Sequence, residues 1–67
     1  MTKQQATELF QAMKVVDESC ADDDVSDGAW QCMLQDVAQA YADDHGLENF
    51  DSFDAFMDYL KWNGGVE

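Results

Sequence analysis

The chain has 67 residues, and 15 Asp and Glu against three Lys and Arg give a formal net charge of −12. The hydrophobic fraction of 46% is too high for a disordered acidic tail, which needs low hydrophobicity as well as high charge. The charge disfavours direct binding to nucleic acid and to anionic membranes, and so small a core leaves no room for a buried catalytic cavity. We therefore expect one domain, residues 1–67, that is not an enzyme and whose partner is a basic protein surface.

Features of exported and membrane proteins are not recognisable in the sequence. The first 20 residues lack the basic region and apolar run of a signal peptide, and no stretch approaches the length of a transmembrane helix. Cys20 and Cys32 are too few for a secreted disulfide scaffold. We expect a cytoplasmic location, in a cell or in an infected host, and no cofactor.

Apolar residues in the first third of the chain recur at steps of three and four, which predicts a helix over residues 3–19. This stripe consists of Ala6, Leu9, Phe10, Met13, Val16 and Cys20. The following run from Ala21 to Val25 contains three consecutive aspartates and favours a loop.

A second apolar stripe predicts a helix over residues 27–44. The stripe consists of Trp30, Met33, Leu34, Val37 and Tyr41. Ser26 or Asp27 suits the N-cap, whereas His45 and Gly46 suit the last turn and its terminal cap.

The third predicted helix covers residues 51–62, begins near Asp51 or Ser52 and is stopped by Gly64 and Gly65. Its apolar face consists of Phe53, Phe56, Met57 and Leu60. Three helices joined by short links, without any alternating strand pattern, predict an all-α fold, a compact three-helix bundle.

The aspartate-rich loop resembles an EF-hand in composition. An EF-hand places oxygen ligands at loop positions 1, 3 and 5, glycine at 6 and glutamate at 12. With Gly28 at position 6, Asp23 and Asp27 fall at positions 1 and 5, but Val25 falls at 3 and Leu34 at 12. Because the bidentate ligand is missing, we expect no specific metal site. Weak binding of divalent cations stays open as an alternative.

Asp51, Ser52 and Phe53 resemble the Asp-Ser-Leu motif of acyl carrier proteins, which are also small, acidic and helical. The resemblance implies phosphopantetheine on Ser52. Carrier proteins continue with two further helices, however, whereas only 15 residues follow Ser52 here. A helix cap is the alternative interpretation. His45 and the two cysteines lack the arrangement of a catalytic triad or a zinc site, so we predict no catalytic or metal-binding residues.

The placement of the acidic residues is the main functional signal. Asp51, Asp54 and Asp58 are three and four residues apart, so they line one strip of the third helix at intervals of roughly 4 to 6 Å. An ordinary solvated helix face mixes signs and uses Glu–Lys pairs, which this chain largely lacks. We interpret the strip as part of a functional acidic surface. Its further members are Asp36, Asp43, Asp22, Asp23, Asp24 and Asp27.

Two aromatic residues complete the predicted partner-binding site. Trp62 lies half a turn of the helical wheel away from Phe53 and Leu60, and we expect Tyr59 or Trp62 to be an exposed anchor of the kind that tight interfaces need. For Trp62 a second interpretation stays open, in which the indole folds back over the end of the bundle. Trp30 is expected in the core, and Cys32 points away from its stripe, either incidentally or within a dimer interface.

In size and charge the chain resembles small acidic phage-type proteins that inhibit host-defence or DNA enzymes by imitating nucleic acid. The resemblance implies a competitive inhibitor whose carboxylates engage Lys and Arg of a CRISPR effector, a restriction or recombination nuclease, or a polymerase. Two alternatives remain: a helical adaptor or dimerisation module with an apolar docking patch, and an acyl-carrier-like or cation-binding protein. The oligomeric state, monomer or homodimer, stays open.

Overall fold

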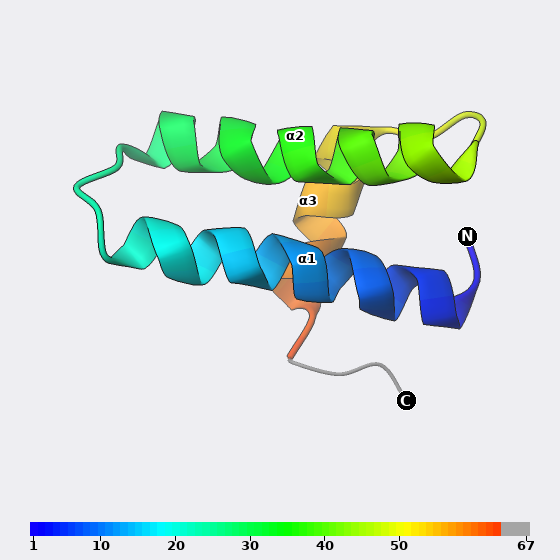
Figure 1. The fold of residues 1–67 in the computed structure, drawn as a ribbon, viewed down its shortest axis with the longest axis horizontal. Helices are drawn as coiled ribbons and strands as arrows, with labels where there is room; N and C mark the ends of the chain where they lie inside the picture. Colours follow the sequence, from blue (N-terminus) through cyan, green and yellow to red (C-terminus); the bar gives the residue numbers. More distant parts are fainter. Residues whose placement is uncertain (64–67) are drawn as a thin grey trace.

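The computed structural model describes residues 1–63, which form three α-helices, α1 (Lys3–Ala21), α2 (Asp27–His45) and α3 (Ser52–Lys61). α1 and α2 run antiparallel beside each other, and α3 crosses behind both (Figure 1). The prediction of an all-α three-helix bundle is confirmed. Each predicted helix boundary, from the ranges 3–19, 27–44 and 51–62, lies within two residues of the observed one.

Local sequence determines where α2 begins and ends. The hydroxyl of Ser26 accepts a hydrogen bond from the backbone N–H of Ala29 at 3.3 Å, so Ser26 is the N-cap. Gly46 ends the helix with a φ of 64°, a left-handed conformation that glycine adopts without steric cost. The next N–H, that of Leu47, donates to the carbonyl of Ala42 at 2.9 Å and so satisfies one of the last carbonyls of the helix.

Polar caps also start the other two helices. The hydroxyl of Thr2 accepts from the N–H of Gln5 at 3.1 Å, and the Gln5 side chain accepts from the N–H of Thr2 at 2.8 Å. This capping box at α1 was not recognised from the sequence. At α3 the carboxylate of Asp51 accepts from the N–H of Phe53 at 2.9 Å, which makes Asp51 the N-cap.

α3 ends at Lys61, and the backbone of Trp62 is already extended, with φ of −79° and ψ of 131°. The N–H of Trp62 donates to the carbonyl of Tyr59 at 2.9 Å, which closes the last turn. The predicted stop at Gly64 and Gly65 lies outside the described residues.

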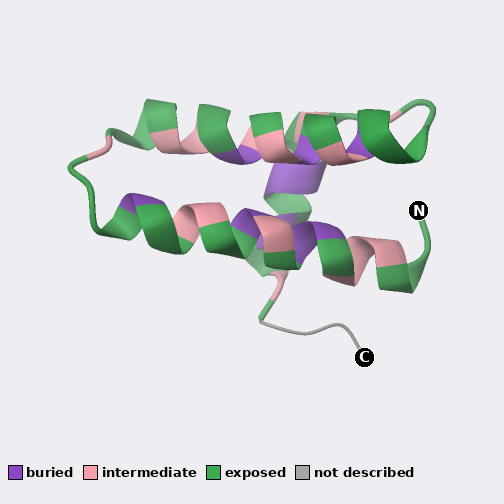
Figure 2. Ribbon diagram, viewed as in Figure 1, coloured by how far each residue is buried: buried purple, intermediate pink, exposed green. Residues whose placement is uncertain are grey.

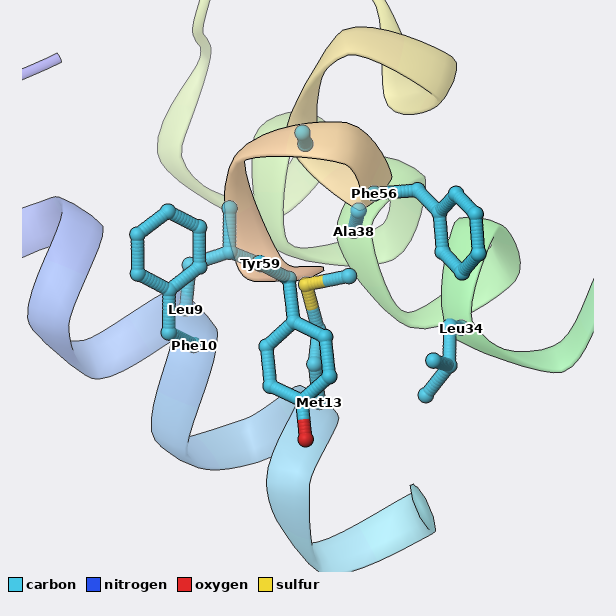
Figure 3. Packing of buried hydrophobic residues seen from close by; sticks show 8 residues of the cluster. Leu9, Phe10, Met13, Leu34, Ala38, Phe56 and Tyr59 are labelled. Atoms are coloured by element: carbon cyan, nitrogen blue, oxygen red, sulfur yellow. The ribbon is translucent and has the colours of Figure 1, made fainter. Parts of the chain in front are cut away.

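One hydrophobic core fills the space between the helices, and the buried sides of α1 and α2 face α3 (Figure 2). The first predicted stripe is correct, because Leu9 and Met13 are fully buried. In the second stripe Leu34 is fully buried, but Met33 is 41% exposed and the small Ala38 takes a core position instead. Figure 3 shows how the core side chains meet. They are Leu9, Phe10, Met13, Leu34, Ala38, Ala55, Phe56 and Tyr59.

The apolar face predicted for α3 is largely wrong. Phe56 is buried, but Phe53, Met57 and Leu60 are 48%, 38% and 49% exposed. The helix buries Ala55 and Tyr59 beside Phe56 instead, because it lies across the α1–α2 layer and only one side of it can face that layer.

Tyr59 was expected to be an exposed anchor, and this expectation is wrong because its exposed fraction is 8%. Its hydroxyl donates to the carboxylate of Asp17 at 2.9 Å, and Trp30 Nε1 donates to the same carboxylate at 2.7 Å. One half-buried aspartate thus joins all three helices. Burial, followed by the hydrogen bond to Asp17, raises the pKa of Tyr59 to about 12.

The described chain is elongated, with principal extents of 33, 24 and 17 Å. The α1–α2 loop and the α2–α3 loop lie at opposite ends of the long axis (Figure 1). None of the helices in residues 1–63 has the length and apolar character needed to cross a membrane.

Candidate partner-binding surface

The predicted acidic strip on α3 exists as an exposed feature of the fold. Asp51, Asp54 and Asp58 are all exposed, and the helix places them on one side at steps of three and four residues. One oxygen of Asp51 caps the helix, whereas Asp54 and Asp58 accept no hydrogen bond from any side chain of residues 1–63. Two of the three carboxylates therefore face solvent with all their acceptor sites free.

The same three carboxylates border a surface hollow of about 360 Å³ between α1, the α2–α3 loop and α3. Much of its wall is hydrocarbon from Leu9, Phe10 and other apolar side chains. The remaining lining residues are Met1, Ala6, Asn49, Phe50 and Ala55. The strip is therefore the charged rim of an apolar depression.

The other predicted acidic residues lie apart from this rim. Asp36 and Asp43 are exposed on α2, where Gln39 donates to Asp43 at 3.2 Å, and neither residue lines the hollow. In the α1–α2 loop Asp22, Asp23 and Asp24 are exposed. Asp27 lines a second hollow of about 280 Å³ at that end, together with Asp17, Cys20, Ala21, Val25 and Trp30. Of the acidic residues predicted to bind a partner, the three at α3 therefore share one hollow, and Asp27 lines a different one.

The carboxylates of the described chain have no strongly basic partners. The ion pair found in residues 1–63 joins Asp44 to its neighbour His45 at 3.8 Å, and no Lys takes part in one. Lys14 instead lies 6.0 Å from the centre of the Trp62 ring, over its face. The negative charge of the surface is thus left uncompensated by ion pairing.

Trp62 folds back onto the bundle, which was the second of the two predictions for this residue. It is half-buried, with its ring centre 5.7 Å from that of Phe10 and 6.1 Å from that of Tyr59. Its indole Nε1 is buried and has no hydrogen-bond partner in the described chain. Neither Tyr59 nor Trp62 therefore provides the exposed anchor that was predicted.

The exposed apolar residues of α3 are a feature that the sequence analysis missed. Phe53, Met57 and Leu60 follow one another at steps of four and three, so they form a continuous apolar strip along the helix. The sequence does contain an indication of this strip, because α3 carries more large apolar residues than one side of a helix can bury. The surplus had to face solvent or a partner.

The residues considered for metal binding or catalysis are dispersed. Cys20 is buried with its Sγ 3.6 Å from the Sδ of Met33, whereas Cys32 is exposed. The ring of His45 stacks on Tyr41 at 4.0 Å and its Nδ1 lies 3.0 Å from the Tyr41 carbonyl, as expected for a residue in the last turn of α2. Within residues 1–63 no three His, Cys, Asp or Glu side chains converge to hold a metal ion.

Comparisons with protein-family models, with curated proteins and with solved structures found no match.

Proposed function

We propose that this chain is a non-catalytic binding protein that occupies the basic, nucleic-acid-binding surface of another protein. The observation that supports this most directly is the set of surface carboxylates, which no Lys side chain pairs with in residues 1–63. Unpaired like charges destabilise a small fold, so their retention favours a use outside it. A basic protein surface is the partner that such a negative field attracts most strongly.

The distribution of charge suits an extended basic channel. Acidic groups lie at both ends of the 33 Å long axis, in the α1–α2 loop and near the C-terminal end of α2, and between them on α3. One helical turn of duplex DNA is about 34–36 Å long, so the chain covers a comparable length. Carboxylates would pair with the Lys and Arg that otherwise contact phosphates, and binding would be competitive with nucleic acid.

The enzymes that fit this mechanism depend on a basic channel for nucleic acid. They include CRISPR effectors, restriction or recombination nucleases and polymerases. In size and charge the chain resembles phage-type inhibitors of such enzymes, and we extend the proposal to that role. Electrostatic steering would speed association and make it sensitive to salt.

The experiment that tests the proposal is affinity capture from a bacterial lysate, with elution by duplex DNA and identification of the eluted proteins by mass spectrometry. We expect a nucleic-acid-binding enzyme that DNA releases. The matched control is the triple variant D51N, D54N and D58N, which keeps side-chain shape and removes charge. Capture of the same partners by the variant, or partners that DNA does not release, would contradict the proposal.

A helical adaptor is a second candidate, and a specific observation favours it. Phe53, Met57 and Leu60 form an exposed apolar strip that a partner would cover. For a purely apolar adaptor, the D51N, D54N and D58N variant would retain full affinity and salt would not weaken binding. Affinity that falls with both changes identifies the acidic mechanism instead.

A further inference from the structure

α3 presents two different strips on the sides that do not enter the core. One strip is apolar and consists of Phe53, Met57 and Leu60. The other is acidic and consists of Asp51, Asp54 and Asp58, each exposed. At 100° per residue the centres of the two strips are about 125° apart, and the strips approach each other most closely at Met57, which lies three residues from Asp54 and next to Asp58. A single ligand lying on α3 would contact both.

The apolar strip is unlike scattered apolar residues on a surface. Single exposed apolar side chains are ordinary, whereas a contiguous row of large ones marks an interaction site. Phe53 also lies beside the core, because its ring centre is 6.5 Å from that of buried Phe56. At this end the strip therefore rests on a packed core residue.

The acidic strip suits long cationic side chains in particular. It borders the hollow of about 360 Å³, whose walls include Leu9, Phe10 and Phe50. Lys and Arg bury their hydrocarbon stems on apolar surface while their charged ends stay at the rim. The hollow opens toward Ala55 and α1 and is lined by none of Phe53, Met57 and Leu60, so it lies on the other side of the acidic strip from them. A ligand on the apolar strip would therefore lay a cationic stem over Met57 and bring its charge to Asp54 and Asp58.

A second copy of this chain does not fit the surface. In a two-fold symmetric dimer the same patch meets itself, so the α3 acids of one copy would face those of the other. Each copy carries a net charge of −12, which adds long-range repulsion. The negative charge beside the apolar strip instead favours a partner that carries positive charge.

We propose that the outer side of α3 docks an amphipathic helix whose apolar face is flanked by Lys or Arg. Apolar side chains of that helix pack on Phe53, Met57 and Leu60, and flanking cationic side chains pair with Asp54 and Asp58. Docking of one helix on another uses apolar residues at steps of three and four on both helices. The inference deepens the proposed function and rests on it, since it assumes a basic partner and names the segment that is bound.

The test uses a fluorescent 14-residue peptide of Leu and Lys with its leucines on one helical face, titrated with the full chain. The apolar variant is M57Q with L60Q, and its control is V15Q with M33Q, two exposed apolar residues on α1 and α2. The charge variant is D54N with D58N, and its control is D36N with D43N. Each of these two double variants removes two negative charges, so they differ only in where on the surface the charges are lost.

We expect the M57Q/L60Q variant to weaken peptide binding about tenfold or more, as loss of interface anchors does, and the V15Q/M33Q control to change it less than about twofold. The D54N/D58N variant should weaken binding more than the D36N/D43N control. Thermal unfolding followed by circular dichroism checks that every variant is folded. A scrambled peptide of the same composition should bind more weakly than the amphipathic one.

Equal affinities for each variant and its control, equal binding of the scrambled peptide, or no binding by the unaltered chain would overturn the inference. None of these results would disprove the proposed function, because capture of a DNA-releasable enzyme is measured separately. Conversely, peptide binding at α3 without any DNA-releasable partner would refute the proposed function and leave the docking surface standing.

Discussion

Asp17 links all three helices through side-chain hydrogen bonds. Its carboxylate lies on α1 and accepts hydrogen bonds from Trp30 on α2 and Tyr59 on α3. Tyr59 is 42 residues away in the sequence, so no local pattern indicated the contact. This long-range bond explains why Tyr59 was wrongly expected at the surface.

The first prediction concerns this carboxylate. We expect Asp17→Ala to lower the free energy of unfolding by about 2–3 kcal/mol, because two partly buried donors lose their acceptor. Urea denaturation followed by circular dichroism measures the change. Glu18→Ala, at the exposed neighbouring position, is the control and should be nearly neutral. A loss at Asp17 no larger than that at Glu18 would contradict the role assigned to the carboxylate.

The second prediction follows from the raised pKa of Tyr59, which is about 12 in the folded chain. An unfolded tyrosine ionises near pH 10, so between pH 10 and 12 the unfolded state loses a proton that the folded state keeps. Stability is therefore complete below about pH 10 and falls as the pH rises toward 12, by up to about 2–3 kcal/mol.

Urea denaturation across pH 8–11.5 measures this dependence. In Tyr59→Phe the hydroxyl is absent, so the decline should become much shallower. The pKa of Tyr41 is also raised, by partial burial and by Glu8. Its ionisation should therefore leave a smaller loss of stability at alkaline pH in the Tyr59→Phe variant. An unchanged alkaline slope in Tyr59→Phe would exclude Tyr59 as its source.

At the scale of the element, helix position was predictable and helix orientation was not. Ser26 and Gly46 act through neighbours within four residues, so the sequence indicates them directly. The buried side of α3 depends instead on how the helix crosses α1 and α2, which periodicity does not encode. Phe53 and Leu60 look like core residues by spacing alone, and the structure leaves them about half exposed.

The third prediction uses two glycines, one in the first turn of α2 and one at its C-cap. Gly46 has a φ of 64° and open space around it, so Gly46→Ala should cost about 1 kcal/mol through backbone strain alone. Gly28 lies in the first turn with nothing within 4 Å of an added Cβ, and Gly28→Ala should stabilise by about 0.5–1 kcal/mol. Thermal unfolding of both variants should show shifts of opposite sign. Shifts of the same sign would contradict the capping account.

At the scale of the whole molecule, the excess of negative charge dominates. The sequence predicted an acidic three-helix bundle, and the structure shows that its surface carboxylates lack Lys partners within residues 1–63. How the acids would be grouped was not predictable, because helix packing decides which of them meet. Among the predicted acids in residues 1–63, Asp51, Asp54 and Asp58 border one hollow and Asp27 borders another, whereas Asp36 and Asp43 line neither of them.

The fourth prediction is that salt stabilises the fold. Raising ionic strength from 10 mM to 150 mM shortens the screening length from about 30 Å to about 8 Å, which weakens repulsion between the carboxylates. We expect the melting temperature to rise by several degrees, and to rise less in the D36N/D43N variant. A flat or falling melting temperature would mean that the unpaired acids do not destabilise the fold.

The central claim is that the acidic surface and nucleic acid compete for one site on a partner. The most direct measurement is fluorescence anisotropy of labelled duplex DNA bound to the captured partner, with increasing amounts of this chain added. We predict that the chain displaces the DNA, that added salt weakens the displacement, and that the D51N, D54N and D58N variant displaces it poorly. A ternary complex in which the partner holds DNA and this chain together would contradict the account.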